Sequence, residues 1–495
     1  MALFSFFAGW ISYLLICLLG LIFIAFLCFC LYIKYIHLKY DHIPGPPRDS
    51  FLFGHLPTIQ REMSNDRVIH DKFLEWAETY GPVYRINGMH AVMLCVTCPD
   101  TTKEVLMSPK YPKGKYSVVL LLHRFFGNGL VTAQNHEEWY KQRRIMDPAF
   151  SSLYLRGQMG AFNERAEKLM DKLADMADTN TAANMQHMFN CVTLDVITKV
   201  TVTSCYPQIP TLPLQFILSV IKLHLFVYLT LYPKNKKFIN EVKKSCQLLR
   251  STGRQWINER KMAVQNGEDV PKDILTQILK TAGKANDDEE LMLDNFVTFF
   301  IAGQETTANQ LAFAVMELGR LPEILTKVRQ EVDDVLGMKQ EINFDDLGKM
   351  TYLSHVLKET LRLYPTAPGT SRFIPNNIVI NGIPIPAGVT CVFNSYVCGR
   401  LDKFFEDPLK FDPERFHPDA AKPYYCYYPF SLGPRSCLGQ SFAQMEAKVV
   451  MAKLLQRFDF SLLPGQSFDI LDTGSLRPKS GVVCNIRHRG QTPAA

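Results

Sequence analysis

The first 33 residues of the chain contain no Asp, Glu, Lys or Arg, and this constrains the fold more than any other feature. About 20 mostly apolar residues are enough for a helix to cross a bilayer. A signal peptide would have a basic N-terminal region, a shorter apolar core and a small-residue cleavage site, which residues 1–33 lack. A buried core helix is the other interpretation, but the length of this stretch favours a transmembrane anchor over residues 1–33.

The charges after the anchor indicate its orientation. Lys34 and Lys39 follow it directly, and positive charge collects on the cytoplasmic side of a membrane protein. We therefore expect a single-pass protein with its N-terminus in the lumen and the rest of the chain in the cytosol. Residues 34–49 are basic and rich in proline, which favours a stiff linker. A globular domain over 50–490 and a disordered tail over 491–495 complete the predicted organisation.

The composition excludes two classes of protein. Lys and Arg number 54 against 48 Asp and Glu, and this excess is spread along the whole chain. A nucleic-acid binder would concentrate its basic residues in a patch or tail, so we expect no nucleic-acid partner. Hydrophobic residues make up 47% of the chain, which is typical of a folded protein rather than a disordered one.

Helical patterns dominate the globular domain. The stretch 83–97 has β-branched residues around Asn87-Gly88, which suggests a hairpin with its turn there, and 378–393 is a second β region, so small sheets are expected. The polar run 283–290 reads as a solvent loop. The sequence therefore predicts a mainly α fold with small β-sheets. The predicted helices cover residues 68–80, 137–146, 161–176, 238–264, 291–318, 321–336, 352–363 and 440–457.

The helix predicted over 291–318 has almost no polar face, as expected of a helix buried through the middle of a large protein. Gly303 inside it costs about 1 kcal/mol relative to alanine. A carboxylate such as that of Glu305 is expensive to bury unless it is paired or used. These residues, with Thr306, indicate either a functional site or a kinked helix with a salt-bridged glutamate, and the pattern alone leaves both open.

The segment 430–439 places Cys437 just before the N-terminus of a predicted helix. Helix-end amides stabilise a thiolate and lower its pKa, and a cysteine thiolate is a recognised axial ligand of haem iron. Gly433 permits a tight turn, and Gly439 permits a flat ligand to approach the backbone closely. Arg435 can pair with a carboxylate of that ligand. The alternative for such a cysteine is a buried structural residue.

This segment resembles the haem-binding signature of the cytochrome P-450 superfamily, with Phe430, Gly433, Arg435, Cys437 and Gly439 in their expected places. The resemblance implies the cytochrome P-450 fold, with a long central helix and a haem-binding cysteine loop. It also implies haem b (iron protoporphyrin IX) as cofactor, with Cys437 as the axial ligand of its iron.

Other motifs of the superfamily occur in the same order. The stretch 358–362 resembles its Glu-x-x-Arg motif, and Arg415 in 413–416 supplies the third member of a structural triad with Glu359 and Arg362. Further residues match partners of the haem propionates or the oxygen-activating motif of the central helix. The resemblance implies propionate contacts for Trp139, Arg143 and Arg372, a hydrogen-bonding role for Thr306 and a proton-relay role for Glu305.

The resemblance implies a monooxygenase of the endoplasmic reticulum membrane that uses O₂ and electrons from NADPH, delivered by an NADPH-dependent flavoprotein reductase. Within the superfamily the chain most resembles the cholesterol 24-hydroxylases, along 41–47, 273–280, 293–303 and 444–457. This implies a sterol side chain as substrate. Fatty acids or other lipophilic compounds are the nearest alternative; a reductase-independent thiolate-haem isomerase and a haem carrier are further ones.

Two sets of residues are predicted near the site. Hypothetical walls of the substrate pocket are Phe125, Phe126, Ala302, Thr306, Ala367 and Thr370. A basic face for an acidic electron-donor protein, or else ordinary solvated helix faces, is expected at Lys141, Arg144, Lys448, Lys453 and Arg457.

Overall fold

The computed structural model describes residues 2–114, 126–201, 236–282, 289–421 and 423–490. Its helices are α1 (Ala2–Tyr40), α2 (Leu56–Ser64), α3 (Ile69–Tyr80), α4 (Pro99–Met107), α6 (His136–Met146), α7 (Ser152–Arg156), α8 (Met159–Asp178), α9 (Met185–Thr201), α12 (Lys236–Gln265), α13 (Ile274–Ala282), α14 (Glu289–Arg320), α15 (Pro322–Leu336), α16 (Phe344–Lys349), α17 (Thr351–Leu363), α18 (Ser395–Cys398) and α19 (Gln440–Arg457). Short 3₁₀ helices are η1 (Asp147–Phe150), η5 (Pro413–Phe416) and η6 (Gly433–Arg435). The strands are β1 (Val83–Gly88), β2 (Ala91–Val96), β3 (Ala183–Asn184), β4 (Gly369–Ile374), β5 (Ile378–Ile380), β6 (Ile383–Ile385), β7 (Val389–Asn394), β8 (Phe458–Leu462), β9 (Ile470–Asp472), β10 (Leu476–Pro478) and β11 (Val483–His488).

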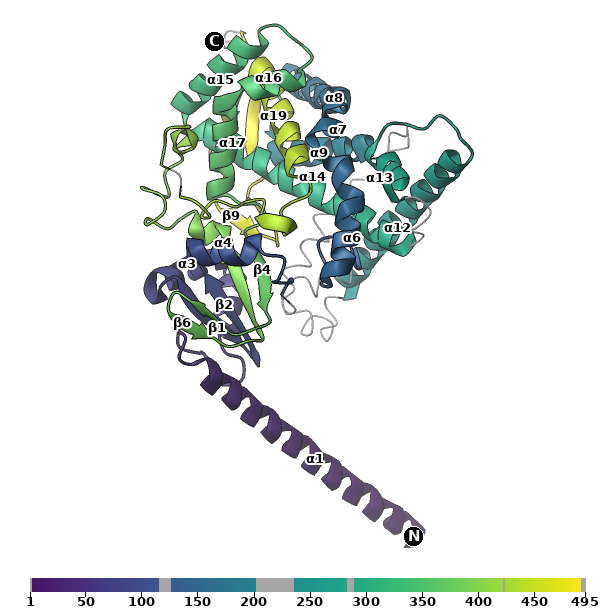
Figure 1. Ribbon diagram of the computed structural model, residues 1–495, viewed down its shortest axis with the longest axis vertical. Helices are drawn as coiled ribbons and strands as arrows, with labels where there is room; N and C mark the ends of the chain where they lie inside the picture. The colour runs from purple at the N-terminus through teal and green to yellow at the C-terminus, as the bar shows by residue number, and fades with distance from the viewer. Residues whose placement is uncertain (1, 115–125, 202–235, 283–288, 422, 491–495) are drawn as a thin grey trace.

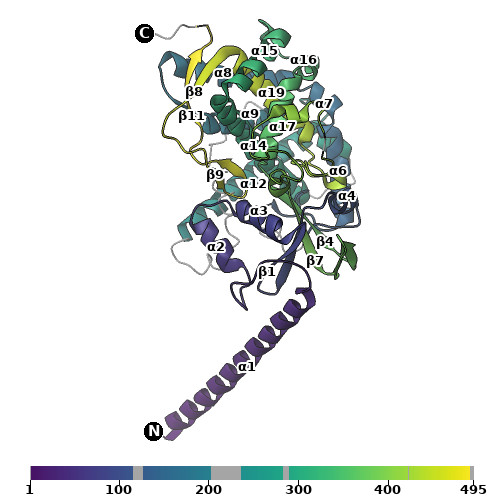
Figure 2. The ribbon, with the colours of Figure 1, turned by 90° about the vertical axis from the view of Figure 1, so that its left-hand side faces the viewer.

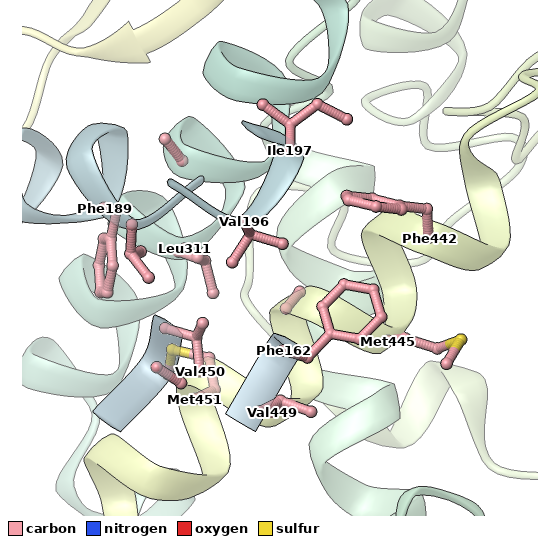
Figure 3. Packing of buried hydrophobic residues seen from close by; sticks show 14 of the residues in the cluster. Phe162, Phe189, Val196, Ile197, Leu311, Phe442, Met445, Val449, Val450 and Met451 are labelled. Atoms are coloured by element: carbon pink, nitrogen blue, oxygen red, sulfur yellow. The ribbon is translucent and has the colours of Figure 1, made fainter. Parts of the chain in front are cut away.

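Helix α14 runs through the middle of the helical part of the molecule and is covered by α9, α12, α17 and α19 (Figures 1 and 2). Its burial follows from its apolar circumference. Figure 3 shows Leu311 of α14 among Phe189 and Val196 of α9 and Val450 of α19. Each such side chain contributes about 1.5–3 kcal/mol through its removal from water. Packing of this kind holds α14 in place beside the cysteine loop that precedes α19.

A four-stranded sheet in the order β1-β2-β7-β4 forms the other part of the body. Strands β2 and β7 pair in parallel, and the outer pairs are antiparallel. The predicted hairpin is confirmed, but its expected turn at Asn87-Gly88 is wrong. Gly88 pairs with Ala91, so the turn lies at Met89 and His90, and Met89 adopts a positive φ of 53°. Asn87 remains within the ladder, where its N–H donates to His55 Nδ1 at 2.9 Å.

The mainly α prediction with small β-sheets is confirmed. All eight predicted helices are present, and each begins and ends within two residues of its expected position. The region 378–393 contains β5, β6 and β7, whereas β4 and α9 were not predicted. Of the expected polar loop, Glu289 and Glu290 instead form the first turn of α14, and residues 283–288 lie outside the described residues, as do the tail 491–495 and position 125.

Helix α1 is long and apolar enough over Gly9–Tyr40 to cross a membrane. It leaves the body at the end where the four-stranded sheet lies (Figures 1 and 2). The helix continues past the predicted end of the anchor at residue 33, so residues 34–40 are helical rather than linker. The reason is a stripe at i, i+3, i+4 and i+7 that the body buries: Ile33, Ile36, His37 and Tyr40.

We predict that Ile36→Ala lowers the stability of the whole domain, because Ile36 packs in one cluster with the strands of the four-stranded sheet. Truncating a buried isoleucine costs about 2–5 kcal/mol. Leu38→Ala on the same helix is the control, since Leu38 is 65% exposed. Thermal unfolding in detergent should show a lower midpoint for Ile36→Ala alone. Equal midpoints for both variants would show that α1 is only a tether.

Candidate active site

The central helix has one strip that its neighbours do not bury. Phe299, Gly303 and Thr306 are half-buried and Ala302 is exposed, although the residues between them are buried. Their spacing of i, i+3, i+4 and i+7 puts all four on one face of α14. The Thr306 hydroxyl donates to the Ala302 carbonyl at 2.7 Å. The interior of the fold therefore presents a narrow strip with a hydroxyl on it.

The loop before α19 is a tight turn whose geometry depends on glycine. Gly433 has a φ of +69°, and a Cβ there would lie 2.2 Å from the Leu106 carbonyl oxygen. The Cys437 N–H donates to the Phe430 carbonyl at 2.8 Å, which closes the loop. At Gly439 the nearest atom to an added Cβ is the Cys437 sulfur, at 3.9 Å. The loop thus fixes Cys437 immediately before the first turn of α19.

The Cys437 side chain is exposed, and its sulfur is available to a ligand. Burial of the surrounding loop raises the pKa of this thiol, while the Gly439 N–H and the positive charge of Arg143 oppose that shift. The sequence predicted a lowered pKa from the helix end alone. In the structure desolvation outweighs the helix end, so the protein without a bound cation favours the thiol.

Three cations converge between the sheet and the cysteine loop. They are Arg372 on β4, Arg435 in η6 and Lys113, which follows α4. Burial lowers the pKa of Arg372 to about 10. Burial and the neighbouring cations lower the pKa of Arg435 to about 9 and of Lys113 to about 7. The Nη2 atoms of Arg372 and Arg435 are buried and have no hydrogen-bond partner among the described residues. Burying three cations together is unfavourable unless an anion pairs with them or Lys113 releases its proton.

Lys113 was not identified from the sequence. Its amine donates to the Val131 carbonyl at 3.0 Å. No motif marks this lysine, and only its position beside Arg372 and Arg435 reveals it.

Helix α6 brings Trp139 and Arg143 to the same region of the site. The Arg435 guanidinium lies 4.1 Å from the centre of the Trp139 ring. Arg143 instead pairs with Asp147 at 2.5 Å and donates to the Ser436 carbonyl at 2.7 Å. Trp139 therefore supports the cation cluster, and Arg143 braces the cysteine loop.

The residues of the expected triad meet in the structure. Arg362 donates to both oxygens of Glu359, at 2.7 and 2.8 Å, and both side chains are fully buried. Arg415 Nε lies 3.4 Å from Glu359 Oε1. Arg362 also donates to the carbonyls of Gly399 and Pro408. The triad joins α17 to the chain that leads into the cysteine loop.

Glu305 and Thr306 are consecutive but face different surroundings. Thr306 lies on the open strip, whereas Glu305 is buried and bonded to Ser475 at 2.7 Å. Of the other expected pocket walls, Ala367 is exposed, Thr370 is half-buried and Phe126 is buried. Phe125 lies outside the described residues.

The expected basic face is wrong in part. Lys453 is completely buried, pairs with Glu167 and donates to the Gln340 carbonyl. Arg457 pairs with Glu167 as well, and Lys448 donates to the Leu347 carbonyl. These three cations are engaged within the protein because α19 is a core helix. Only Lys141 and Arg144, on α6, are exposed.

Comparison with known proteins identifies the family. The family profile described as cytochrome P-450 matches residues 44–485, so the chain belongs to the cytochrome P-450 family. Cytochrome P-450 4B1 of Rattus norvegicus is 29% identical over 89% of both chains. Cytochrome P-450 3A7 of Homo sapiens is 30% identical over 84% of this chain and 85% of its own. The 11-oxo-beta-amyrin 30-oxidase of Glycyrrhiza uralensis is 29% identical over 79% of this chain and 78% of its own.

Membership of this family makes the protein a monooxygenase that binds haem b. The residues present fit that cofactor. Haem b carries two carboxylates, which suit the three cations and the unpartnered Nη2 atoms of Arg372 and Arg435. An exposed cysteine suits the iron. Phe299, Ala302 and Thr306 present an open strip rather than bulky buried side chains.

We predict that Lys113→Met weakens haem retention, because it removes one of the three cations available to the propionates. Haem transfer to an excess of an apo-globin acceptor should become roughly tenfold faster, equivalent to about 1.4 kcal/mol. Lys110→Met is the control, since Lys110 is exposed in the same segment. The two variants should differ; equal transfer rates would remove Lys113 from the cofactor site.

Proposed function

We propose that this chain is a haem-thiolate monooxygenase, anchored in the endoplasmic reticulum membrane, that hydroxylates the side chain of a sterol. Electrons would come from NADPH through a flavoprotein reductase. The observation that carries the proposal is the open strip of α14, with Thr306 on it, in a fold that holds an exposed cysteine before α19. Helix α1 supplies the anchor.

Each site residue has a distinct part in this proposal. Cys437 is the axial ligand of the haem iron, and the bound haem supplies the oxidising chemistry. Arg372, Arg435 and Lys113 pair with the propionates, and Trp139 packs against Arg435. Arg143 holds the cysteine loop through Ser436. Glu359, Arg362 and Arg415 maintain the fold of the chain that enters the loop.

Thr306 and Glu305 are proposed to serve proton delivery. The Thr306 hydroxyl now donates to the Ala302 carbonyl, and rotation of its side chain would let it hold a water molecule on the open strip. Burial raises the pKa of Glu305 to about 7. A carboxyl with such a pKa both releases and regains a proton near neutrality, as a general acid requires.

The sterol assignment rests on the resemblance to the cholesterol 24-hydroxylases, which lies mainly in framework segments such as 293–303 and 444–457. One relative is named as an oxidase of a single position, carbon 30, of 11-oxo-beta-amyrin, and our proposal likewise assigns this chain one region of its substrate, the sterol side chain. Fatty acids and other lipophilic compounds form the second candidate class. The same machinery serves both classes, and the loops that choose between them vary more freely than the scaffold.

Turnover of cholesterol tests the proposal. The purified full-length protein would be reconstituted with NADPH-dependent reductase in lipid vesicles, and cholesterol and a long-chain fatty acid would be supplied separately. We expect a side-chain hydroxysterol as the main product, and no product without NADPH. Hydroxylation of the fatty acid alone would contradict the sterol assignment and establish the second candidate class.

A further inference from the structure

Glu305 is held from one side by an ordered chain of side chains. The Ser475 hydroxyl donates to Glu305 Oε1 at 2.7 Å. Asn309, one turn further along α14, donates to the Ser475 oxygen at 3.3 Å. Gln186 of α9 in turn donates to Asn309 Oδ1 at 2.9 Å. Each side chain in this series donates a hydrogen bond to the next, and the series ends at Glu305. Oε1 of Glu305 is therefore held in place as the acceptor of the Ser475 hydroxyl.

The second oxygen of Glu305 is different. Oε2 is buried and has no hydrogen-bond partner among the described residues. The side chain as a whole is buried, and this burial is the main cause of its raised pKa. The Ser475 hydrogen bond and the charge of Arg477 lower the pKa in part, with a smaller effect of Asn309. Oε2 is therefore the oxygen at which a proton can sit.

Ser475 is itself held in place at the turn between β9 and β10. Asp472, at the end of β9, lies 3.6 Å from the His70 ring of α3. The Leu476 N–H, at the start of β10, donates to the Thr366 carbonyl at 3.1 Å. Ser475 is buried between these two contacts. Its position is thus set by elements outside α14, so it can define the rotamer of Glu305.

We propose that Ser475 is a positioning residue of this enzyme: its hydroxyl fixes Oε1 of Glu305 and thereby reserves Oε2 as the proton-carrying oxygen. The inference rests on the proposed role of Glu305 in proton delivery. Oε2 gives its proton to a water molecule, the carboxylate that remains is stabilised by the Ser475 O–H, and a proton from solvent restores the acid. Ser475 keeps its own proton throughout.

The charged groups around Glu305 are few. The hairpin contributes Arg477, while Gln186 from α9 and Asn309 from α14 are uncharged. The Ser475 hydrogen bond is stronger to the carboxylate than to the neutral carboxyl, so its loss raises the pKa of Glu305. A hydrogen bond to a charged group corresponds to a rise of about 1–2 pH units.

Infrared titration of the resting holoenzyme tests the proposal without turnover. The carboxylic C=O band of Glu305 is identified as the band that Glu305→Gln removes. We expect its midpoint to move upward by about 1–2 pH units in Ser475→Ala, and to stay near the wild-type value in Ser475→Thr, which retains a hydroxyl. Ser461→Ala, at an exposed position of β8, is the control. An unchanged midpoint in Ser475→Ala, or an equal rise in Ser475→Thr, would overturn the proposal.

A second measurement separates this inference from the role of Glu305. With NADPH, reductase and cholesterol, the fraction of NADPH recovered as hydrogen peroxide is measured against pH. The pH dependence of this fraction in Ser475→Ala should be displaced in the same direction and by the same amount as the infrared midpoint. If Glu305→Gln leaves the fraction unchanged while the infrared shift is present, Ser475 positions Glu305 but Glu305 does not deliver protons, and the mechanistic half of the proposal fails.

Discussion

The structure depends on the burial of α14. A helix that is apolar around almost its whole circumference cannot face water, so α9, α12, α17 and α19 must surround it. These helices leave one strip open, at Phe299, Ala302, Gly303 and Thr306. The residues between them and on either side, in the middle of the described helix, are buried. The same packing that stabilises the fold therefore leaves one accessible strip on α14, and our proposal places the substrate there.

Electrostatics determine the opposite side of the site. Arg372, Arg435 and Lys113 come from separate segments, and burying them together without an anion is unfavourable. The protein keeps a compensated cluster, Glu359 with Arg362 and Arg415, a short distance along the chain. In this cluster the Glu359 carboxylate pairs with both arginines within the protein, and the cluster stabilises the fold. The other lacks its counter-charge and is suited to a dicarboxylate cofactor.

Local patterns predicted much of this. The helical pattern of 291–318, with almost no polar face, predicted the central helix, because burial in the core determines where that helix lies. The residue spacing in 430–439 indicated the cysteine loop. Lys113 and Ser475 could not be found, because neither belongs to a motif and both acquire meaning through partners more than 100 residues away in sequence. Lys453 was misassigned for the same reason: its partner Glu167 lies on α8, and only the packing of α8 on α19 brings them together.

The central claim is that Cys437 binds the haem iron as a thiolate. The most direct test is the absorption spectrum of the reduced carbon monoxide complex of the purified protein and of Cys437→Ser. The wild-type protein should show the strongly red-shifted band that thiolate ligation produces. The variant should retain haem through the cation cluster and lose the red shift, and Cys191→Ser, altered at a half-buried cysteine of α9, should keep it. A red-shifted band that persists in Cys437→Ser would contradict the account.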